Sequence, residues 1–244
     1  MGLQMNENKH QGVLTFEERL EDFKKSVDLK KYTDNPFLFL RRQRFTEYLH
    51  RIKLFEKILH VKGSIVECGV HKGGSLMLYY HLSTVLEPYA FNRTIYGFDT
   101  FEGFRSISEK DSPDVDETMF SDADYDILKN AIEIQDMNRN VSEVKKSVLI
   151  RGDATKTIPD FTTKHPELII ALLYLDFDIY EPTKTALEHF LPLVPKGGVV
   201  AFDELNVKKW AGETLALKEF IDLKTIKLEK CNFDPWSSYF VVGA

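Results

Sequence analysis

The sequence predicts an α/β domain built on a mostly parallel sheet, with a helical arm before it. From Gly63 onward, short apolar runs alternate with helical patterns, as expected for parallel strands whose two faces are both covered. After Lys224, two further runs flank a turn signal, so a terminal antiparallel hairpin brings the sheet to seven strands. The apolar runs lie at 65–68, 94–98, 147–150, 168–175, 198–202, 226–231 and 239–242, and the helical patterns near 74–87, 122–138, 181–191 and 212–222.

Two helices are expected ahead of the sheet. Thr15 and Glu18 form a T-x-x-E capping box, which predicts a helix running to about Leu29. Asn35 and Pro36 have the residue types preferred at an N-cap and at the first helical position, so a second helix is predicted from there to about residue 60.

This pattern divides the chain into two predicted parts. Residues 1–62 are interpreted as a loose tail, over 1–14, followed by a helical arm, and residues 63–244 as the main domain. Because the main domain does not need the arm, two roles for it are left open, a lid and a contact in a homo-oligomer.

The composition and charge of the chain argue against several classes of function. The 244 residues carry 32 Lys and Arg against 38 Asp and Glu, a net charge of −6, which argues against nucleic acid as the main partner. No apolar run approaches the ~20 residues of a membrane span, and no signal peptide is visible. Cys68 and Cys231 have no metal-site spacing, so we expect free thiols in a reducing, cytoplasmic compartment.

A glycine-rich turn follows the first predicted strand. Its pattern is E-x-G-x-x-x-G-G, in which Gly69 allows a sharp turn, while Gly73 and Ser75 open a helix with free N–H groups. His71 replaces the second glycine of a dinucleotide motif, and Glu67 would repel a pyrophosphate but suits a cationic methionyl group. The turn therefore favours S-adenosylmethionine, against the alternative of a turn that binds nothing.

Acidic residues also follow the next two strands. Asp99 is placed to bind ribose hydroxyls at the carboxyl edge of the sheet, where open α/β folds bind ligands. Asp153 either accepts from an adenine amino group or caps the helix from Thr155. For Asp99 the alternative is a solvated strand end or a helix cap.

A second acidic group follows strands four and five. If these strands are neighbours, Asp176, Asp203 and Glu204 converge, and clustered carboxylates suit Mg²⁺ or another divalent cation. Such an ion would lower the pKa of an acceptor hydroxyl for methyl transfer, with Asp178 or Asp176 itself as the group that takes the proton. Strand-end and helix-capping roles are the alternative.

Four motifs resemble the macrocin O-methyltransferase family. They are ECGVHKGGS at 67–75, GFDTFEGF at 97–104, LDFDIYEPT at 175–183 and GGVVAFDE at 197–204, within a resemblance spanning about 63–220. Within the family the chain is most similar to TDP-rhamnose 3-O-methyltransferases, which share the helical arm and the second motif. Many members carry Asp-Asp where this chain has Asp203-Glu204.

The resemblance implies a Rossmann-like class I methyltransferase that uses S-adenosylmethionine, with Mg²⁺ at Asp176, Asp203 and Glu204. The implied acceptor is a small molecule, a nucleotide-deoxysugar or a glycosylated natural product. Three alternatives stay open: a catechol or phenol acceptor, a nicotinamide-dependent reductase, and a non-catalytic protein that binds S-adenosylmethionine. Arg41, Arg42 and Arg44 either grip a nucleotide-sugar phosphate or form a solvated face.

Overall fold

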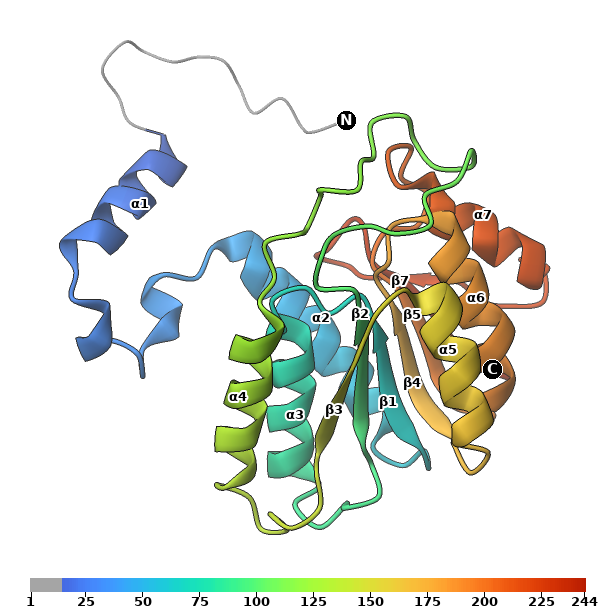
Figure 1. Cartoon of the computed structure of the whole chain (residues 1–244), viewed down its shortest axis with the longest axis horizontal. Helices are drawn as coiled ribbons and strands as arrows, with labels where there is room; N and C mark the ends of the chain where they lie inside the picture. Colours follow the sequence, from blue (N-terminus) through green and yellow to red (C-terminus); the bar gives the residue numbers. More distant parts are fainter. Residues whose placement is uncertain (1–14) are drawn as a thin grey trace. The chain divides into compact units, whose positions relative to one another are not determined.

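The computed structural model describes residues 15–244 (Figure 1). The described chain forms two compact units, one ending at Glu47 and the other running over Tyr48–Ala244. The later part of the predicted arm therefore packs with the sheet. The lid or contact role predicted for residues 1–62 stays a prediction, and the loose tail predicted for residues 1–14 lies outside the described residues.

The first unit contains short helices. The predicted capping box is confirmed, because Thr15 and Glu18 cap each other's backbone at the start of α1 (Phe16–Ser26). The second helix was predicted to start too early. Pro36–Leu38 forms a single 3-10 turn, and α2 (Arg42–Ile58) begins only afterwards. The side chain of Asn35 makes no capping hydrogen bond, so the first-turn N–H groups lack the acceptor that would stabilise a longer helix.

The second unit is built on a seven-stranded sheet of order β3-β2-β1-β4-β5-β7-β6. β1 to β5 are parallel, and β7 pairs antiparallel with both β5 and β6. The predicted mostly parallel sheet with a terminal antiparallel hairpin is therefore confirmed. The strands are β1 Ser64–Cys68, β2 Ile95–Asp99, β3 Ser147–Arg151, β4 Ile170–Leu175, β5 Val199–Phe202, β6 Glu229–Lys230 and β7 Ser238–Val241.

Helices cover both faces of this sheet (Figure 1). The helices are α3 Gly74–Leu86, α4 Tyr125–Asp136, α5 Ala154–Lys164, α6 Tyr180–Phe190 and α7 Ala211–Phe220. One core joins the sheet to α3, α4 and the end of α2, and the other joins it to α5, α6 and α7. Alternate strand residues face opposite cores, as Ile65 and Val66 do, which explains the unbroken apolar runs in the sequence.

The strand order reverses between β1 and β4, the point at which open α/β sheets form a ligand crevice. The ladder extends to the strand tips, because the Asp176 N–H donates to Cys68 O over 2.8 Å and the Asp203 N–H donates to Leu175 O over 2.9 Å. The predicted site residues therefore share one edge. Cys68 and Cys231 are buried free thiols, and within residues 15–244 no helix could cross a membrane.

Candidate functional site

The glycine turn after β1 is closely packed. Gly69 has φ +93°, and a Cβ atom there would lie 1.9 Å from the carbonyl oxygen of Asp176. Gly73, the N-cap of α3, has φ +80°, and a Cβ there would lie 2.3 Å from a methyl carbon of Leu128. Both positions therefore favour glycine for their backbone conformation, and at Gly69 the neighbouring backbone also leaves no space for a side chain.

Glu67 is an isolated acid at this turn. It belongs to β1, is 1% exposed, and its Oε2 has no hydrogen-bond partner in the described part of the chain. Burial raises the pKa of Glu67 to about 8, Asp99 and Asp203 add to the rise, and Arg51 opposes it. A buried acid without a partner fits a ligand that brings a positive charge or a hydrogen-bond donor.

Asp99 holds the glycine turn in place. Its carboxylate accepts hydrogen bonds from the backbone N–H groups of Val70, His71 and Phe101, each at 2.7 Å. Asp153 caps α5, because it accepts from the N–H and hydroxyl of Thr155 at 3.0 and 2.7 Å. The capping alternative for Asp153 is thus confirmed, while the ribose and adenine contacts stay predictions.

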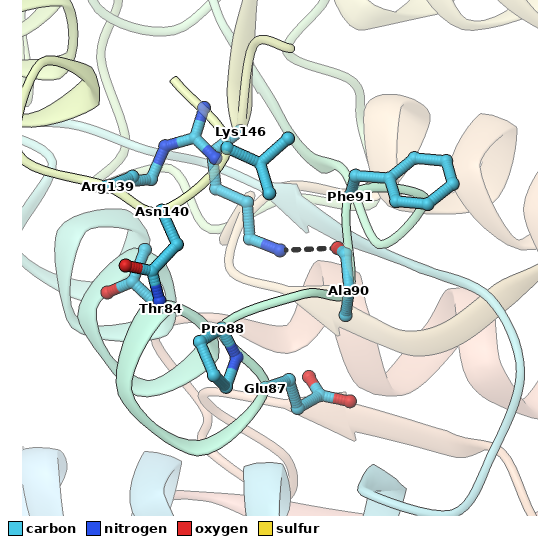
Figure 2. A pocket seen from close by; sticks show the side chains of 9 residues that line it. Thr84, Glu87, Pro88, Ala90, Phe91, Arg139, Asn140 and Lys146 are labelled. Atoms are coloured by element: carbon cyan, nitrogen blue, oxygen red, sulfur yellow. Dashed lines mark hydrogen bonds between the residues drawn. The ribbon is translucent and has the colours of Figure 1, made fainter. Parts of the chain in front are cut away.

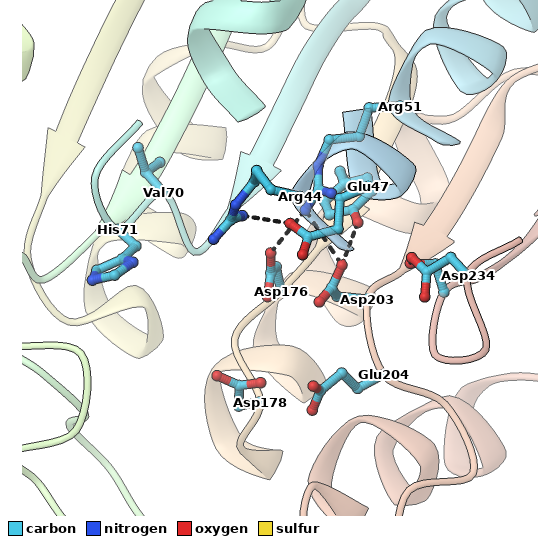
Figure 3. A network of polar contacts seen from close by, with 12 residues as sticks. Arg44, Glu47, Arg51, Val70, His71, Asp176, Asp178, Asp203, Glu204 and Asp234 are labelled. Atoms are coloured by element: carbon cyan, nitrogen blue, oxygen red, sulfur yellow. Dashed lines mark hydrogen bonds and ion pairs between the residues drawn. The ribbon is translucent and has the colours of Figure 1, made fainter. Parts of the chain in front are cut away.

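Asp176 and Asp203 lie beside each other at the tips of β4 and β5, because the preceding residues Leu175 and Phe202 are paired. Figure 3 shows Arg51 reaching between them. Its Nη2 lies 3.4 Å from Asp176 Oδ2 and 3.3 Å from Asp203 Oδ1. Tyr174 completes the group, since its hydroxyl donates to Asp203 Oδ1 over 2.6 Å and its ring centre lies 4.7 Å from the guanidinium carbon.

Arg51 is not among the site residues predicted from the sequence. A signal for it exists, because Arg51 stands three, four and seven residues before Leu54, Phe55 and Ile58, which places a charge on the apolar face of α2. The arginines that the sequence singles out are Arg41, Arg42 and Arg44. In the first unit Arg41 and Arg44 pair with Glu21 and Glu47 on exposed surface, as the solvated-face alternative expects.

Asp178 and Glu204 are held by a third acid that was not predicted from the sequence. Glu213 of α7 is fully buried and accepts from the backbone N–H groups of Asp178, at 3.3 Å, and of Glu204, at 3.4 Å. Asp178 has φ +63°, an uncommon conformation for a residue other than glycine. Glu213 thus fixes the two loops that follow β4 and β5.

Nearby positive charges do not fully offset the acidic group that follows β4 and β5, whose members are Asp176, Asp178, Asp203, Glu204 and Glu213. Burial, together with neighbouring carboxylates, raises the pKa of Asp176 and Asp178, that of Glu204 to about 7 and that of Glu213 to about 8. The Oε2 atom of Glu204 is buried without a hydrogen-bond partner among the described residues. Hard oxygen donors with this deficit fit a divalent cation. Within residues 15–244, however, no three His, Cys, Asp or Glu side chains are arranged as a metal site.

Aromatic side chains from two loops meet over this edge. Phe104 and Phe120 come from the segment between β2 and α4, and Trp210 from the loop before α7. Phe120 lies 5.5 Å from Phe104 and 6.1 Å from Trp210, measured between ring centres, and 5.5 Å from the ring of His71 in the glycine turn. These contacts anchor the segment between β2 and α4 to the loop after β5.

The model of the family described as macrocin-O-methyltransferase (TylF) matches residues 39–241. This chain belongs to the macrocin-O-methyltransferase family. Two solved structures agree. One, described as the calicheamicin methyltransferase CalS11, is 33% identical over 95% of both chains with a TM-score of 0.88. The other, the apo form described as a TDP-rhamnose 3'-O-methyltransferase of calicheamicin biosynthesis, is 32% identical over 95% of this chain and 97% of that one, with a TM-score of 0.80.

Two curated relatives of this macrocin-O-methyltransferase family member match over 152 residues. A tetracenomycin 4'-O-methyltransferase that acts on a dimethoxyrhamnosyl form, from Streptomyces olivaceus, is 29% identical over 60% of this chain and 54% of its own. The mycinamicin III 3''-O-methyltransferase of Micromonospora griseorubida is 27% identical over 59% of this chain and 56% of its own. The matched stretch spans about half of each relative. The family resemblance read from the four motifs is confirmed.

The family member also has a small pocket away from this site. Figure 2 shows Lys146, Arg139 and Asn140 lining it together with residues that follow α3. Lys146 directly precedes β3, and its Nζ donates to the carbonyl of Ala90 over 2.9 Å. The pocket therefore lies at the amino ends of the strands, and none of the predicted site residues contributes to it.

Proposed function

We propose that this chain is an S-adenosylmethionine-dependent, magnesium-assisted O-methyltransferase. Its proposed acceptor is a sugar hydroxyl, on a nucleotide-deoxysugar or a glycosylated natural product. The observation that carries the proposal is the convergence, at one sheet edge, of the glycine turn with Glu67 and the carboxylates of Asp176, Asp178 and Asp203. Membership in the macrocin-O-methyltransferase family supports it.

The cofactor is assigned to the crevice at β1. The unpartnered Oε2 of Glu67 would receive the methionyl ammonium group or a water beside it, and the α3 N-terminus at Gly73 and Ser75 would face its carboxylate. Asp99 would present its remaining lone pairs to the ribose, and Asp153 would lie near the adenine.

We place the acceptor hydroxyl beside Asp176 and Asp178. Asp178 would take its proton, which suits a buried carboxylate with a raised pKa. The freed oxygen forms a bond to the methyl carbon as the carbon–sulfur bond breaks, so S-adenosylhomocysteine leaves as the neutral sulfide. Asp176, Asp203 and Glu204 would hold the divalent cation, which when bound lowers the pKa of the sugar hydroxyl.

The test is methyl transfer from labelled S-adenosylmethionine to TDP-rhamnose, followed by mass spectrometry of the product. We expect transfer that needs Mg²⁺ and that Asp178→Asn slows by about 10²–10⁴. A panel with a catechol and a rhamnosylated macrolide separates the acceptor classes, and transfer to the catechol alone would overturn the sugar assignment. Absence of S-adenosylmethionine binding would remove the proposal entirely.

A further inference from the structure

Arg51 places a permanent positive charge inside the acidic group. The side chain comes from α2, is 2% exposed, and directs Nη2 to one oxygen each of Asp176 and Asp203. An arginine stays charged at any pH at which the protein folds. Two carboxylates at neighbouring strand tips repel each other, and a guanidinium between them offsets that repulsion.

Arg51 also contacts two of the carboxylates that a metal would need. Two of the three proposed metal ligands, Asp176 and Asp203, already direct an oxygen toward Nη2, while Glu204 has a buried Oε2 with no hydrogen-bond partner in residues 15–244. Among the described residues, the three carboxylates are not gathered as a metal site. A cation that gathered them would have to share these oxygens with the guanidinium or displace it.

We infer that Arg51 is a positioning residue that acts as a tethered cation, holding Asp176 and Asp203 in place and competing with the divalent cation for their oxygens. The inference rests on the proposed metal site. Metal affinity is then set by competition between the guanidinium and the divalent cation, and it depends on α2, the helix that carries Arg51.

A merely structural arginine gives the opposite result. If Arg51 only supported the fold of the site, its removal would loosen the carboxylates and weaken metal binding. If it competes, its removal strengthens metal binding, because a positive charge a few ångströms from a dication opposes it even at the effective dielectric of a protein surface.

The experiment measures Mn²⁺ binding to the full chain without substrates, by electron paramagnetic resonance of free Mn²⁺. Arg51→Met keeps the length of the side chain and removes the charge, and we expect its Kd to be at least about tenfold lower than that of the unmodified protein. Arg51→Lys keeps a charge and is expected to stay within about threefold.

Tyr174→Phe is the matched control. It removes another donor to Asp203 Oδ1 without changing the charge, so we expect a shift of less than about threefold. Thermal melts with and without Mn²⁺ provide a second readout. Arg51→Met should melt lower than the unmodified protein without Mn²⁺ and gain more from its addition.

Unchanged or weaker Mn²⁺ binding in Arg51→Met overturns the inference, and so does a failure of this variant to fold even with Mn²⁺ present. Asp176→Asn separates this outcome from failure of the proposed function. If the unmodified protein and Asp176→Asn bind Mn²⁺ equally poorly, the metal site itself is wrong. If Asp176→Asn loses binding and Arg51→Met gains none, only the competing role of Arg51 fails.

Discussion

Gly69 and Asp176 meet at the carboxyl ends of β1 and β4, where a Cβ atom added to Gly69 would lie 1.9 Å from the carbonyl oxygen of Asp176. The backbone that turns around the proposed cofactor thus rests directly on the backbone that carries the acidic group. The Asp176 N–H also donates to Cys68 O, one residue before Gly69, over 2.8 Å. Any shift of the glycine turn therefore moves Asp176 as well.

This contact predicts a severe effect of Gly69→Ala. The substitution adds a clash with backbone, which cannot rotate away, to the strain of an L-residue at φ +93°. We expect a loss of about 3 kcal/mol or more in the free energy of unfolding, with loss of S-adenosylmethionine binding. Urea denaturation and isothermal titration measure the two effects.

Gly197→Ala is the matched control for strain alone. Gly197 has φ +89°, but the nearest atom to an added Cβ there is 3.7 Å away, on the side chain of Val61. We expect it to lose about 1 kcal/mol and to keep cofactor binding. Equal losses from the two alanines would contradict the close approach of Gly69 and Asp176.

The strands were predictable because burial on both faces leaves an unbroken apolar run, as in β4, where all six residues are buried. The meeting of Asp176 and Asp203 at the strand ends was also predictable, because the carboxyl ends of parallel neighbouring strands lie at the same edge of a sheet. The start of α2 was not predictable from residue preferences at Asn35 and Pro36, because a cap depends on a hydrogen bond that the side chain does not make.

Arg51 and Glu213, which contact the other residues of the acidic group, could not be predicted as their partners from the sequence. Arg51 meets Asp176 and Asp203 across separations of 125 and 152 residues, so only the three-dimensional packing of α2 brings them together. Glu213 lies in the helix predicted near 212–222, and nothing local in the sequence indicates that both its oxygens face the loops after β4 and β5.

Glu67→Gln tests the proposed cofactor contact through stability and binding together. The folded pKa of Glu67, about 8, lies above the ordinary value of 4.5, so between these pH values the folded protein binds a proton that the unfolded chain has released. Stability is therefore lost as pH rises from about 4.5 to 8, and a neutral glutamine avoids that loss. We expect Glu67→Gln to melt higher by several degrees at pH 8 and by little at pH 5, measured by calorimetry.

The same variant should bind S-adenosylmethionine about tenfold or more weakly, because the carboxylate that would meet the cationic group is gone. Glu188→Gln, on the exposed face of α6, serves as the control and should change neither property. A Glu67→Gln protein with normal stability at pH 8 and normal cofactor affinity would contradict both the isolation of Glu67 and its proposed role.

Asp178→Asn tests the proposed base. Asparagine tolerates the positive φ of this position and keeps the size of the side chain, so folding and cofactor affinity should be retained. We expect the rate of methyl transfer to fall by about 10²–10⁴, the range typical of a lost general base. The measurement is single-turnover transfer at saturating S-adenosylmethionine, with Asp114→Asn in an exposed loop as the control. A rate within a few-fold of the unmodified protein would assign the proton to another group.

Arg93, at the opposite edge of the sheet, is expected to affect stability and not the proposed site. Arg93 is 5% exposed. Its guanidinium pairs with Glu87 at 2.8 Å and donates to the carbonyls of Gly63 at 2.9 Å, Val61 at 2.9 Å and Ile58 at 3.1 Å. It thereby joins the end of α2 to the end of α3 and supplies donors to the carbonyls of Val61 and Gly63 in the loop before β1.

Arg93→Met should therefore lose about 3–5 kcal/mol, because Glu87 and three carbonyls would lose their shared donor in a buried place. Lys164→Met removes the exposed ion pair with Asp160 instead and should stay within about 0.5 kcal/mol. Because Arg93 lies away from the carboxyl edge, the folded fraction of Arg93→Met should bind S-adenosylmethionine with unchanged affinity. A selective loss of binding at normal stability would mean that this end of the sheet contributes to the site.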